Sequence, residues 1–330
     1  MIVIAGKTLQ SPVLLAPLAG ITDLPFRNLV SRFGAGLVVS EMIASQEMVQ
    51  AKPGVREKAE LGMGVENTSV QLAGCDAYWM AEAAKLAEAN GARIIDINMG
   101  CPAKKVTSAG GSGASGSALM KDIDHALTLI EAVISAVHVP VTLKTRLGWD
   151  DDMRNAPELA KRAEAAGVQM ITIHGRTRCQ FYKGVADWAA IREVKESVNV
   201  PVIANGDIED EHSAKEALRL SGADGVMVGR GARGKPWLLA QIAAEIFDGP
   251  PPHVPRGMNL LNMVLEHYEE MLSFYGLALG VRVARKHLGW YLNGTCIDQT
   301  LRRAILTSNN PNEVRRLLEP ALCGEPGIAA

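Results

Sequence analysis

The segments MITIHGR (170–176), PVIANGD (201–207) and GVMVGRG (225–231) decide the fold of this 330-residue chain. Each is a short apolar run that ends in glycine and in polar or charged side chains. Continuous apolar runs of this kind are typical of parallel strands that are buried on both faces. Working outward, earlier segments of the same kind are VLLAPLAG (13–20), LVVSE (37–41), SVQLAG (69–74), IIDINMG (94–100) and VTLKTRLG (141–148).

Amphipathic stretches separate these runs, such as AYWMAEAAKLAEAN (77–90) and APELAKRAEAAG (156–167). They end in asparagine or glycine, which commonly terminate helices. Strands and helices in alternation indicate parallel strands that are joined by right-handed crossovers. Eight such units within residues 1–247 predict an α/β fold, a (β/α)₈ TIM barrel. A doubly wound open sheet is the alternative, but it would need fewer units.

The pattern changes after the barrel. DGPPPHVPRG (248–257) holds four prolines, which cannot continue a helix, and it is typical of a linker. Residues 258–330 carry no further strand pattern and predict a small helical bundle, with a capping pattern at Asn310, Pro311 and Glu313. We therefore expect a barrel over 1–247, a linker over 248–257 and a helical domain over 258–330.

Composition narrows the class of protein. The net charge is −2, so any nucleic-acid binding must come from local patches. Five cysteines without a CxxC pair fit a reduced protein without a metal site. The first residues lack the regions of a signal peptide, and no apolar run approaches the length of a membrane span. We expect a cytoplasmic protein without a membrane segment, and the sequence does not predict the oligomeric state.

Polar residues mark the ends of most predicted strands. In a TIM barrel the active site lies at the carboxyl ends of the strands, so these side chains are expected to meet there. Partly exposed strand ends also tolerate polar residues, which is the alternative explanation. The residues are Gln71, Asn98, Cys101, Lys144, Arg146, His174, Arg176, Asn205, Asp207 and Arg230.

Glycines follow the seventh and eighth strands, in Asn205-Gly206-Asp207 and Gly229-Arg230-Gly231. Their backbone N–H groups could approach a phosphate, which usually binds at this position in such barrels. Lys144 and His174 point to the barrel mouth if the register is right, where a cation would stabilise a reduced flavin. A buried core histidine is the alternative for His174.

Cys101 lies just past the fourth strand, in a turn between Gly100 and Pro102. A thiol there is a competent proton donor near neutral pH, although a buried structural cysteine is the alternative. The later stretch GSGASG (111–116) matches a dinucleotide fingerprint, but it lies too far from its strand and lacks the acidic residue that should follow.

The motifs resemble the tRNA-dihydrouridine synthase family, most closely its bacterial B-type branch of nitrogen-regulation homologues. The resemblance spans positions 16 to 292, and its most specific parts are MGCPAKK with the lysine, HGRT and NGD segments. It rests on APLAGITDLPFR, SEM, VQLAG, DINMGCPAKKV, GSALM, VTLKTRLGW, TIHGRTR, PVIANGDI, GADGVMVGRGARGKPW and ARKHLGWYL.

The resemblance implies an FMN enzyme that uses NADPH to reduce uridines of tRNA to dihydrouridine. It makes Cys101 the general acid and places Asn98 near the flavin and the bound uracil. It implies that Arg176, Arg178, Arg282, Arg285 and Lys286 meet RNA, although a solvated helix face is an equal alternative for the last three. The implied FMN contacts are Ala16, Pro17, Leu18, Gln71, Lys144, His174, Asn205, Gly206, Asp207, Gly229 and Arg230.

One segment departs from the family pattern. TSAGGSGAS (107–115), which follows the cysteine motif, is longer and richer in glycine than expected, and could leave the Cys101 loop disordered until tRNA binds. Two other functions remain open: a flavin barrel that reduces a free pyrimidine or enone, and an RNA-binding protein without enzymatic activity.

Overall fold

The computed structural model describes residues 1–52, 54–55, 60–61, 67–108 and 114–323. The chain divides into two compact units. The first comprises Met1–Gly231 and Leu239–Pro251, and the second comprises Ala232–Leu238 and Pro252–Ala330. The chain thus passes into the second unit within the proline-rich segment 248–257, and residues 232–238 belong with the helices.

The first unit is a closed barrel, which confirms the predicted fold class. Among the described residues, eight parallel strands form a ring that closes through the pairings of β4 with β6 and of β11 with β3. The short strand β5 (Ile43–Ala44) adds to the end of β6. The ring consists of β3 (Val13–Leu15), β4 (Leu37–Val39), β6 (Thr68–Ala73), β7 (Ile95–Met99), β8 (Val141–Arg146), β9 (Ile171–His174), β10 (Val202–Asn205) and β11 (Gly225–Val228).

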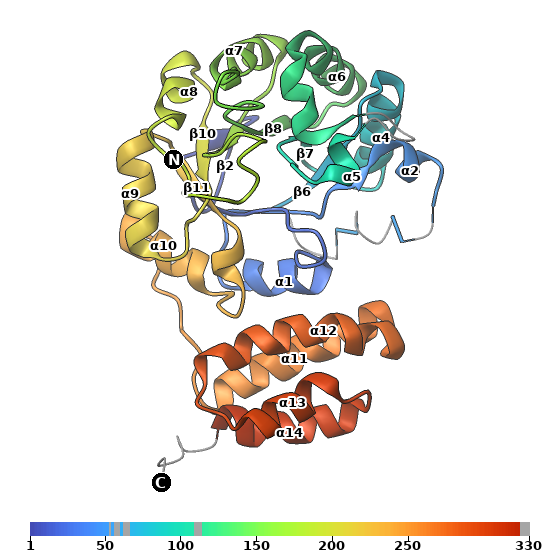
Figure 1. Cartoon of the computed structure of the whole chain (residues 1–330), viewed down its shortest axis with the longest axis vertical. Coiled ribbons are helices and arrows are strands. Elements are labelled where there is room, and N and C mark those ends of the chain that lie inside the picture. The colour runs from blue at the N-terminus through green and yellow to red at the C-terminus, as the bar shows by residue number, and fades with distance from the viewer. Residues whose placement is uncertain (53, 56–59, 62–66, 109–113, 324–330) are drawn as a thin grey trace. The chain divides into compact units, whose positions relative to one another are not determined.

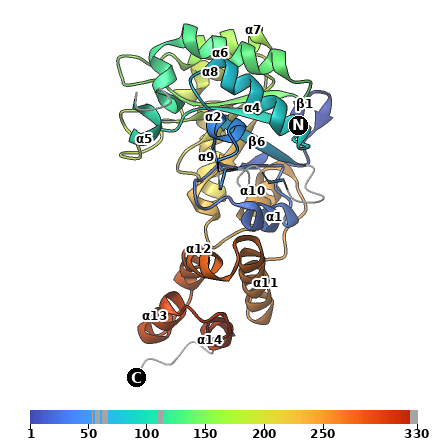
Figure 2. The same ribbon diagram turned by 90° about the vertical axis from the view of Figure 1, so that its right-hand side faces the viewer.

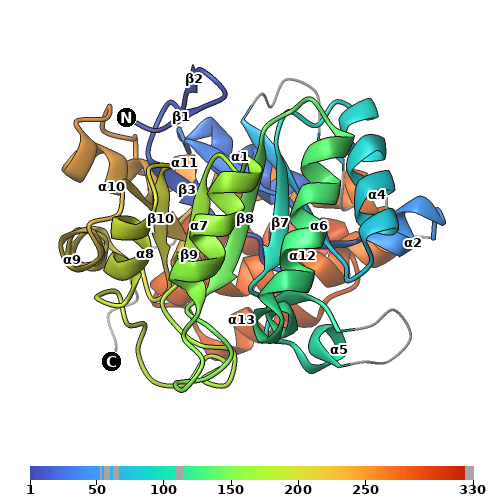
Figure 3. The ribbon, with the colours of Figure 1, turned by 90° about the horizontal axis from the view of Figure 1, so that it is seen from above.

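Helices cover the outside of the strands (Figure 1), and Figure 3 shows α6 and α7 lying over β7 and β8. Aspartates cap the amino-terminal ends of helices in this unit. Asp76, before α4, accepts the backbone N–H of Trp79, and Asp122, before α6, accepts that of His125. The helices of this unit are α1 (Leu24–Arg32), α2 (Ser45–Val49), α4 (Ala77–Ala89), α5 (Lys104–Thr107), α6 (Ile123–Ala136), α7 (Ala156–Ala166), α8 (Ile191–Ser197), α9 (Glu211–Ser221) and α10 (Leu238–Phe247), with 3₁₀ turns η1 (Gly116–Lys121) and η2 (Arg230–Ala232).

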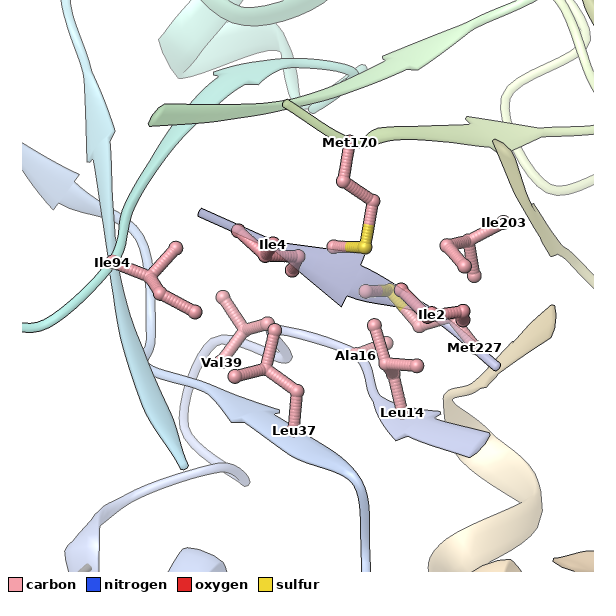
Figure 4. Packing of buried hydrophobic residues seen from close by; sticks show 10 residues of the cluster. All are labelled: Ile2, Ile4, Leu14, Ala16, Leu37, Val39, Ile94, Met170, Ile203 and Met227. Carbon is pink, nitrogen blue, oxygen red and sulfur yellow. The ribbon is translucent and has the colours of Figure 1, made fainter. Parts of the chain in front are cut away.

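An amino-terminal hairpin plugs one end of the barrel. Its strands, β1 (Val3–Ile4) and β2 (Lys7–Thr8), pair antiparallel, and Ile2 and Ile4 are almost fully buried. Figure 4 shows both isoleucines surrounded by side chains from the barrel strands. Two of these neighbours, Ile94 and Met170, directly precede β7 and β9, so the hairpin fills the amino-terminal end of the strands. The remaining neighbours are Leu14, Ala16, Leu37, Val39, Ile203 and Met227.

The second unit is a helical bundle. In its described part, each of α11, α12, α13 and α14 packs against two of the others, and Figure 2 shows them in pairs. Arg233, from the 232–238 segment, lies over the Trp290 ring at 5.2 Å from its centroid. The helices are α11 (Met258–Tyr275), α12 (Leu277–Tyr291), α13 (Gln299–Thr307) and α14 (Pro311–Cys323), with the 3₁₀ turn η3 (Leu292–Gly294).

Two buried histidines lie between α11 and α12. The rings of His267 and His287 meet edge to face, with centroids 4.9 Å apart. His267 Nδ1 lies 2.9 Å from the hydroxyl of Tyr291. Burial, aided by the charge of Lys286, lowers the pKa of His287 to about 3. The folded helical unit therefore holds a neutral imidazole that the unfolded chain would protonate in mild acid.

No helix among the described residues is long and apolar enough to cross a membrane. Within the same residues, no cluster of three or more histidine, cysteine or acidic side chains could hold a metal ion.

We expect Ile4→Ala to lower the free energy of unfolding by about 2–4 kcal/mol, because it removes buried methyl groups from the plug. The matched control is Val3→Ala, since Val3 is 47% exposed on the same strand and its loss should change stability by less than about 0.5 kcal/mol. Denaturant titrations measure both. Equal effects of the two changes would show that the hairpin does not stabilise the barrel.

We expect the stability of the helical unit to decrease as the pH falls from about 6.5 towards about 3, because only the unfolded chain gains a proton at His287 in this range. The slope should approach about 1.4 kcal/mol per pH unit for one proton. His287→Leu should flatten the slope, whereas His138→Gln, at an exposed position, should leave it unchanged. Unfolding curves of the whole chain, recorded between about pH 4 and pH 8, measure how the free energy of unfolding changes with pH.

Candidate functional site

The polar residues predicted at the strand ends lie side by side in the barrel. The strand register pairs Asn98 with Lys144 and pairs Asn205 with His174. Because all strands run the same way, these pairs lie at the carboxyl ends, opposite the apolar hairpin plug. Lys144, Asn205 and Asn98 are buried despite their polarity. Buried polar groups require partners, and the contacts between strands supply them.

Lys144 is a buried cation on β8. Its Nζ donates a hydrogen bond to Asn205 Oδ1 at 3.0 Å, and Asn205 Nδ2 in turn donates to the carbonyl of Met227 at 2.8 Å. Burial, together with the charge of Arg146, lowers the pKa of Lys144 to about 8. The side chain is therefore mostly charged at neutral pH, and it loses its charge in mild alkali.

Arg176 is enclosed by acceptors. Its guanidinium forms an ion pair with Asp207, at 2.6 and 3.0 Å. It also donates to the carbonyls of Lys183 and Gly184, at 3.0 and 2.7 Å. With Nη1 also 3.3 Å from His174 Nε2, every N–H group of Arg176 has a partner. The side chain is only 2% exposed, so it holds Asp207 and the segment at 183–184 in place.

Asp207 joins two arginines at the end of β10. Besides Arg176, it pairs with Arg230 at 3.4 Å, and it accepts the backbone N–H of Ala186 at 2.8 Å. Burial alone would raise the pKa of Asp207, but the hydrogen bonds from Arg176 and Ala186 outweigh it and hold the pKa below its usual range. The carboxylate is thus ionised at neutral pH and directs Arg230 towards this end of β10.

His174 is neutral in this setting. Burial lowers its pKa well below the usual value, and the nearby charges of Arg146 and Lys144 add to the effect. The contact with Arg176 at Nε2 favours the tautomer whose proton lies on Nδ1, since Nε2 must accept. His174 can therefore act as a neutral hydrogen-bond donor at the barrel mouth.

The glycine turns after β10 and β11 differ in the space that they leave for a side chain. Gly206 has φ +113°, and a Cβ there would lie 2.9 Å from Ala186 Cβ and 3.0 Å from the His174 ring. A side chain would therefore push His174 away. At Gly229 a Cβ would meet only Ala16 and Leu18, both at 3.8 Å, so the turn after β11 is open.

The predicted contacts before α1 lie on the first βα loop of the barrel. Ala16 is buried, and its N–H donates to the carbonyl of Val228 at 2.8 Å. Leu18 N–H donates to Thr22 Oγ1 at 2.8 Å. Pro17 lies between them. The loop thus connects directly to the end of β11, next to the open turn at Gly229.

The Cys101 turn is held on both sides. Asn98 Oδ1 accepts the N–H of Cys101 at 3.0 Å, and the Cys101 carbonyl accepts Ser117 Oγ at 2.8 Å. Gly116 has φ +58°, and a Cβ there would lie 2.8 Å from that carbonyl. The glycine at this position is thus required by close backbone approach. The glycine-rich segment 107–115 was predicted to loosen this turn. Its residues 109–113 lie outside the described residues.

Arg146 is a site residue to which the sequence analysis gave no role. Its Nε donates to the carbonyl of Gly100 at 2.8 Å, and its Nη1 donates to the carbonyls of Thr177 and Phe181 at 2.9 and 2.8 Å. The side chain is 1% exposed. It ties the Cys101 turn to the segment after β9. The sequence does indicate a structural role for Arg146, because a charged residue in the buried strand segment VTLKTRLG needs hydrogen-bond partners.

The residues predicted to meet RNA have different surroundings. Arg178 is partly exposed, and its guanidinium lies 4.8 Å from the centre of the Trp149 ring. In the helical unit, Arg282 and Lys286 are exposed. Arg285 instead donates to the carbonyls of Thr307 and Ser308, at 3.1 and 3.3 Å, where α13 ends. Its position at these carbonyls indicates a helix-capping role.

A cavity of about 510 Å³ opens at the ends of β5 and β6. Its lining includes Ser45, Glu47, Asp76 and Trp79, together with Lys105 from the segment after Cys101. None of the site residues that were predicted from the sequence lines this cavity.

Comparison with known proteins gives a consistent assignment. The family described as "Dihydrouridine synthase (Dus)" matches residues 14–323. A "Probable tRNA-dihydrouridine synthase" of Rhodobacter capsulatus is 61% identical over 315 residues, which is 95% of each chain. "tRNA-dihydrouridine synthase B" of Pseudomonas syringae pv. tomato is 46% identical, over 88% of this chain and 85% of its own.

Solved structures share the fold at low sequence identity. Histamine dehydrogenase from Rhizobium sp. superposes with a TM-score of 0.56 at 13% identity, covering 81% of this chain and 50% of its own. Morphinone reductase in complex with tetrahydroNAD superposes with a TM-score of 0.53 at 14% identity, covering 78% of this chain and 92% of its own.

The resemblance seen in the sequence motifs is thereby confirmed. With the family matched across nearly the whole barrel and helical bundle, the chain belongs to the dihydrouridine synthase family.

Proposed function

We propose that this protein reduces uridines of tRNA to 5,6-dihydrouridine, with FMN as its cofactor and NADPH as its reductant. One observation carries the proposal. The Cys101 turn is anchored at the carboxyl end of β7, next to the buried ammonium of Lys144, whose strand pairs with β7 at Asn98. A proton donor beside a cation is the combination that reduction of a conjugated C=C bond requires.

The chemistry of the side chains fits a flavin mononucleotide. Lys144 offers a cation and His174 offers a neutral donor, which suit the electron-rich edge of a flavin ring. Arg230 and the open turn at Gly229 suit a phosphate. We propose the following FMN contacts: Ala16, Pro17, Leu18, Gln71, Lys144, His174, Asn205, Gly206, Asp207, Gly229 and Arg230. The Asp207 carboxylate is occupied by two arginines, so we assign its side chain the task of orienting Arg230.

The reaction needs a hydride and a proton at neighbouring carbons. When bound, the flavin supplies the hydride that adds to C6 of uracil. Negative charge then develops towards C5 and O4, and Cys101 delivers its proton to C5. Asn98 holds the backbone of Cys101. In this proposal its side chain would also lie close to the bound base.

The tRNA must present its base outside the stack, since the ring has to enter the barrel mouth. We propose that Arg178, Arg282 and Lys286 contact the RNA, because they are at least partly exposed. Arg178 also donates one hydrogen bond, to Thr107 Oγ1 at 3.1 Å. Arg176 and Arg285 each donate to several protein acceptors, so we assign these two the positioning of their segments. With tRNA as the substrate, the cytoplasm is the proposed location.

We expect Cys101→Ala to retain bound flavin and NADPH oxidation but to form dihydrouridine about 10²- to 10⁴-fold more slowly, as expected when a general acid is lost. Dihydrouridine in unmodified tRNA is the measurement. Cys179→Ala, at an exposed position, is the matched control and should retain full activity. If Cys101→Ala loses its flavin, the cysteine is structural. Activity on free uridine but not on tRNA would favour a small-molecule reductase.

We expect Lys144→Met to weaken flavin binding and to slow flavin reduction by NADPH, because a buried cation is removed. In the wild type the same rate should fall as the pH rises through about 8, where Lys144 loses its proton. Stopped-flow absorbance measures both, with exposed Lys7→Met as the control. A pH-independent wild-type rate, or an unchanged rate in Lys144→Met, would refute this role.

A further inference from the structure

Asp96 is a buried carboxylate with no role in the function proposed so far. It lies on β7 and is 4% exposed. The strand register places it between Gln71 on β6 and Thr142 on β8. Burial raises the pKa of Asp96, while hydrogen bonds from Thr142 and Gln71 oppose the shift. A carboxylate in a barrel interior is unfavourable unless its oxygens are satisfied, so its contacts need an explanation.

Both oxygens of Asp96 accept hydrogen bonds. Thr142 Oγ1 donates to Oδ1 at 2.6 Å, and Gln71 Nε2 donates to Oδ2 at 2.7 Å. Because Oδ2 of Asp96 accepts here, Gln71 turns its Nε2 towards the carboxyl group. The amide of Gln71 then has one orientation, with Oε1 on the far side from the carboxylate.

The hydrogen bonds continue from Gln71 to the cysteine turn. Gln71 Oε1 accepts from Asn98 Nδ2 at 2.7 Å, which leaves Asn98 Oδ1 as an acceptor. That oxygen accepts the N–H groups of Gly100 at 3.2 Å and of Cys101 at 3.0 Å. If Asn98 were reversed, it would present Nδ2 to these N–H groups, and donors would face each other. If Gln71 were reversed, its Nε2 would face Asn98 Nδ2 in the same way.

We propose that Asp96 is a positioning residue that fixes the order of the Gln71 and Asn98 amides and, through them, the place of Cys101. The proposal rests on the function assigned to Cys101 above. Asp96 acts only through other side chains. Its own position is fixed because Gln71 on β6 and Thr142 on β8 lie beside it in the strand register.

Three substitutions separate the acceptor for Gln71, the charge of Asp96 and its hydrogen bond with Thr142. Asp96→Leu removes the acceptor for Gln71. Asp96→Asn removes the charge but keeps an acceptor, since its oxygen can face Gln71 while its Nδ2 donates to Thr142 Oγ1. Thr142→Val removes the other hydrogen bond of Asp96, and it is the matched control because it leaves the Gln71 contact intact.

The first readout is tRNA reduction in a single turnover by enzyme already reduced with NADPH. Asp96→Leu should slow this step by roughly 10- to 100-fold, because a small displacement of an acid lowers the rate strongly. Its flavin reduction by NADPH, measured at about pH 6 so that Lys144 stays protonated without the neighbouring charge of Asp96, should stay at the wild-type rate. Asp96→Asn and Thr142→Val should remain within about threefold of wild type in both steps. Impairment of Asp96→Asn or Thr142→Val equal to that of Asp96→Leu would overturn the proposal.

The second readout does not depend on tRNA or on turnover. Alkylation of Cys101 by iodoacetamide, followed by peptide mass spectrometry, should become about threefold faster or more in Asp96→Leu, since the turn loses an anchor. If wild type reduced no tRNA, this ratio would still test the positioning role. If Asp96→Leu does not fold, Asp96→Ala removes the same acceptor with a smaller side chain and should give the same acceleration. Wild-type alkylation rates in the folded variant would refute the proposal.

Discussion

The pairing of β4 with β6 and of β11 with β3 turns a row of parallel strands into a ring, and the site depends on this closure. Parallel strands end on the same side, so closure gathers residues from distant parts of the chain at one rim. The hydrogen bond from Lys144 to Asn205 spans 61 positions of sequence, and that from Arg178 to Thr107 spans 71. An open sheet would separate its first and last strands and leave the first βα loop away from the turn at Gly229.

The two ends of the barrel divide the tasks of stability and chemistry. The hairpin end holds a cluster of buried apolar side chains and stabilises through their burial. The opposite end buries Lys144, Asp96 and Arg146, each of which is unfavourable by itself. There the hydrogen bonds hold the charges in defined places, which preorganises the site before any substrate arrives. The neutral state of His174 and the lowered pKa of Lys144 follow first from burial and then from the neighbouring cations.

Much of this arrangement could be predicted from the sequence, because fully buried parallel strands require continuous apolar runs and the fold brings their ends together. The surroundings of Arg176 and Arg285 could not be predicted. Their acceptors include the carbonyl groups of Gly184 and Thr307, which only the tertiary structure brings close. The hairpin strands have two residues each, too few for any periodicity. Asp96 could also have been predicted, because an acidic residue within the apolar run IIDINMG is unfavourable unless hydrogen bonds satisfy it.

The amino-terminal plug also has a consequence for the order in which the chain can fold. Ile2 and Ile4 precede all strands of the ring in the chain, yet their neighbours include Ile203 and Met227. The strand β3 likewise waits for β11 to complete its pairing. Contacts of such sequence separation slow folding, because a long loop must close before they form. On the ribosome the first residues therefore remain without their final neighbours until the last barrel strand has emerged, and the barrel closes only then.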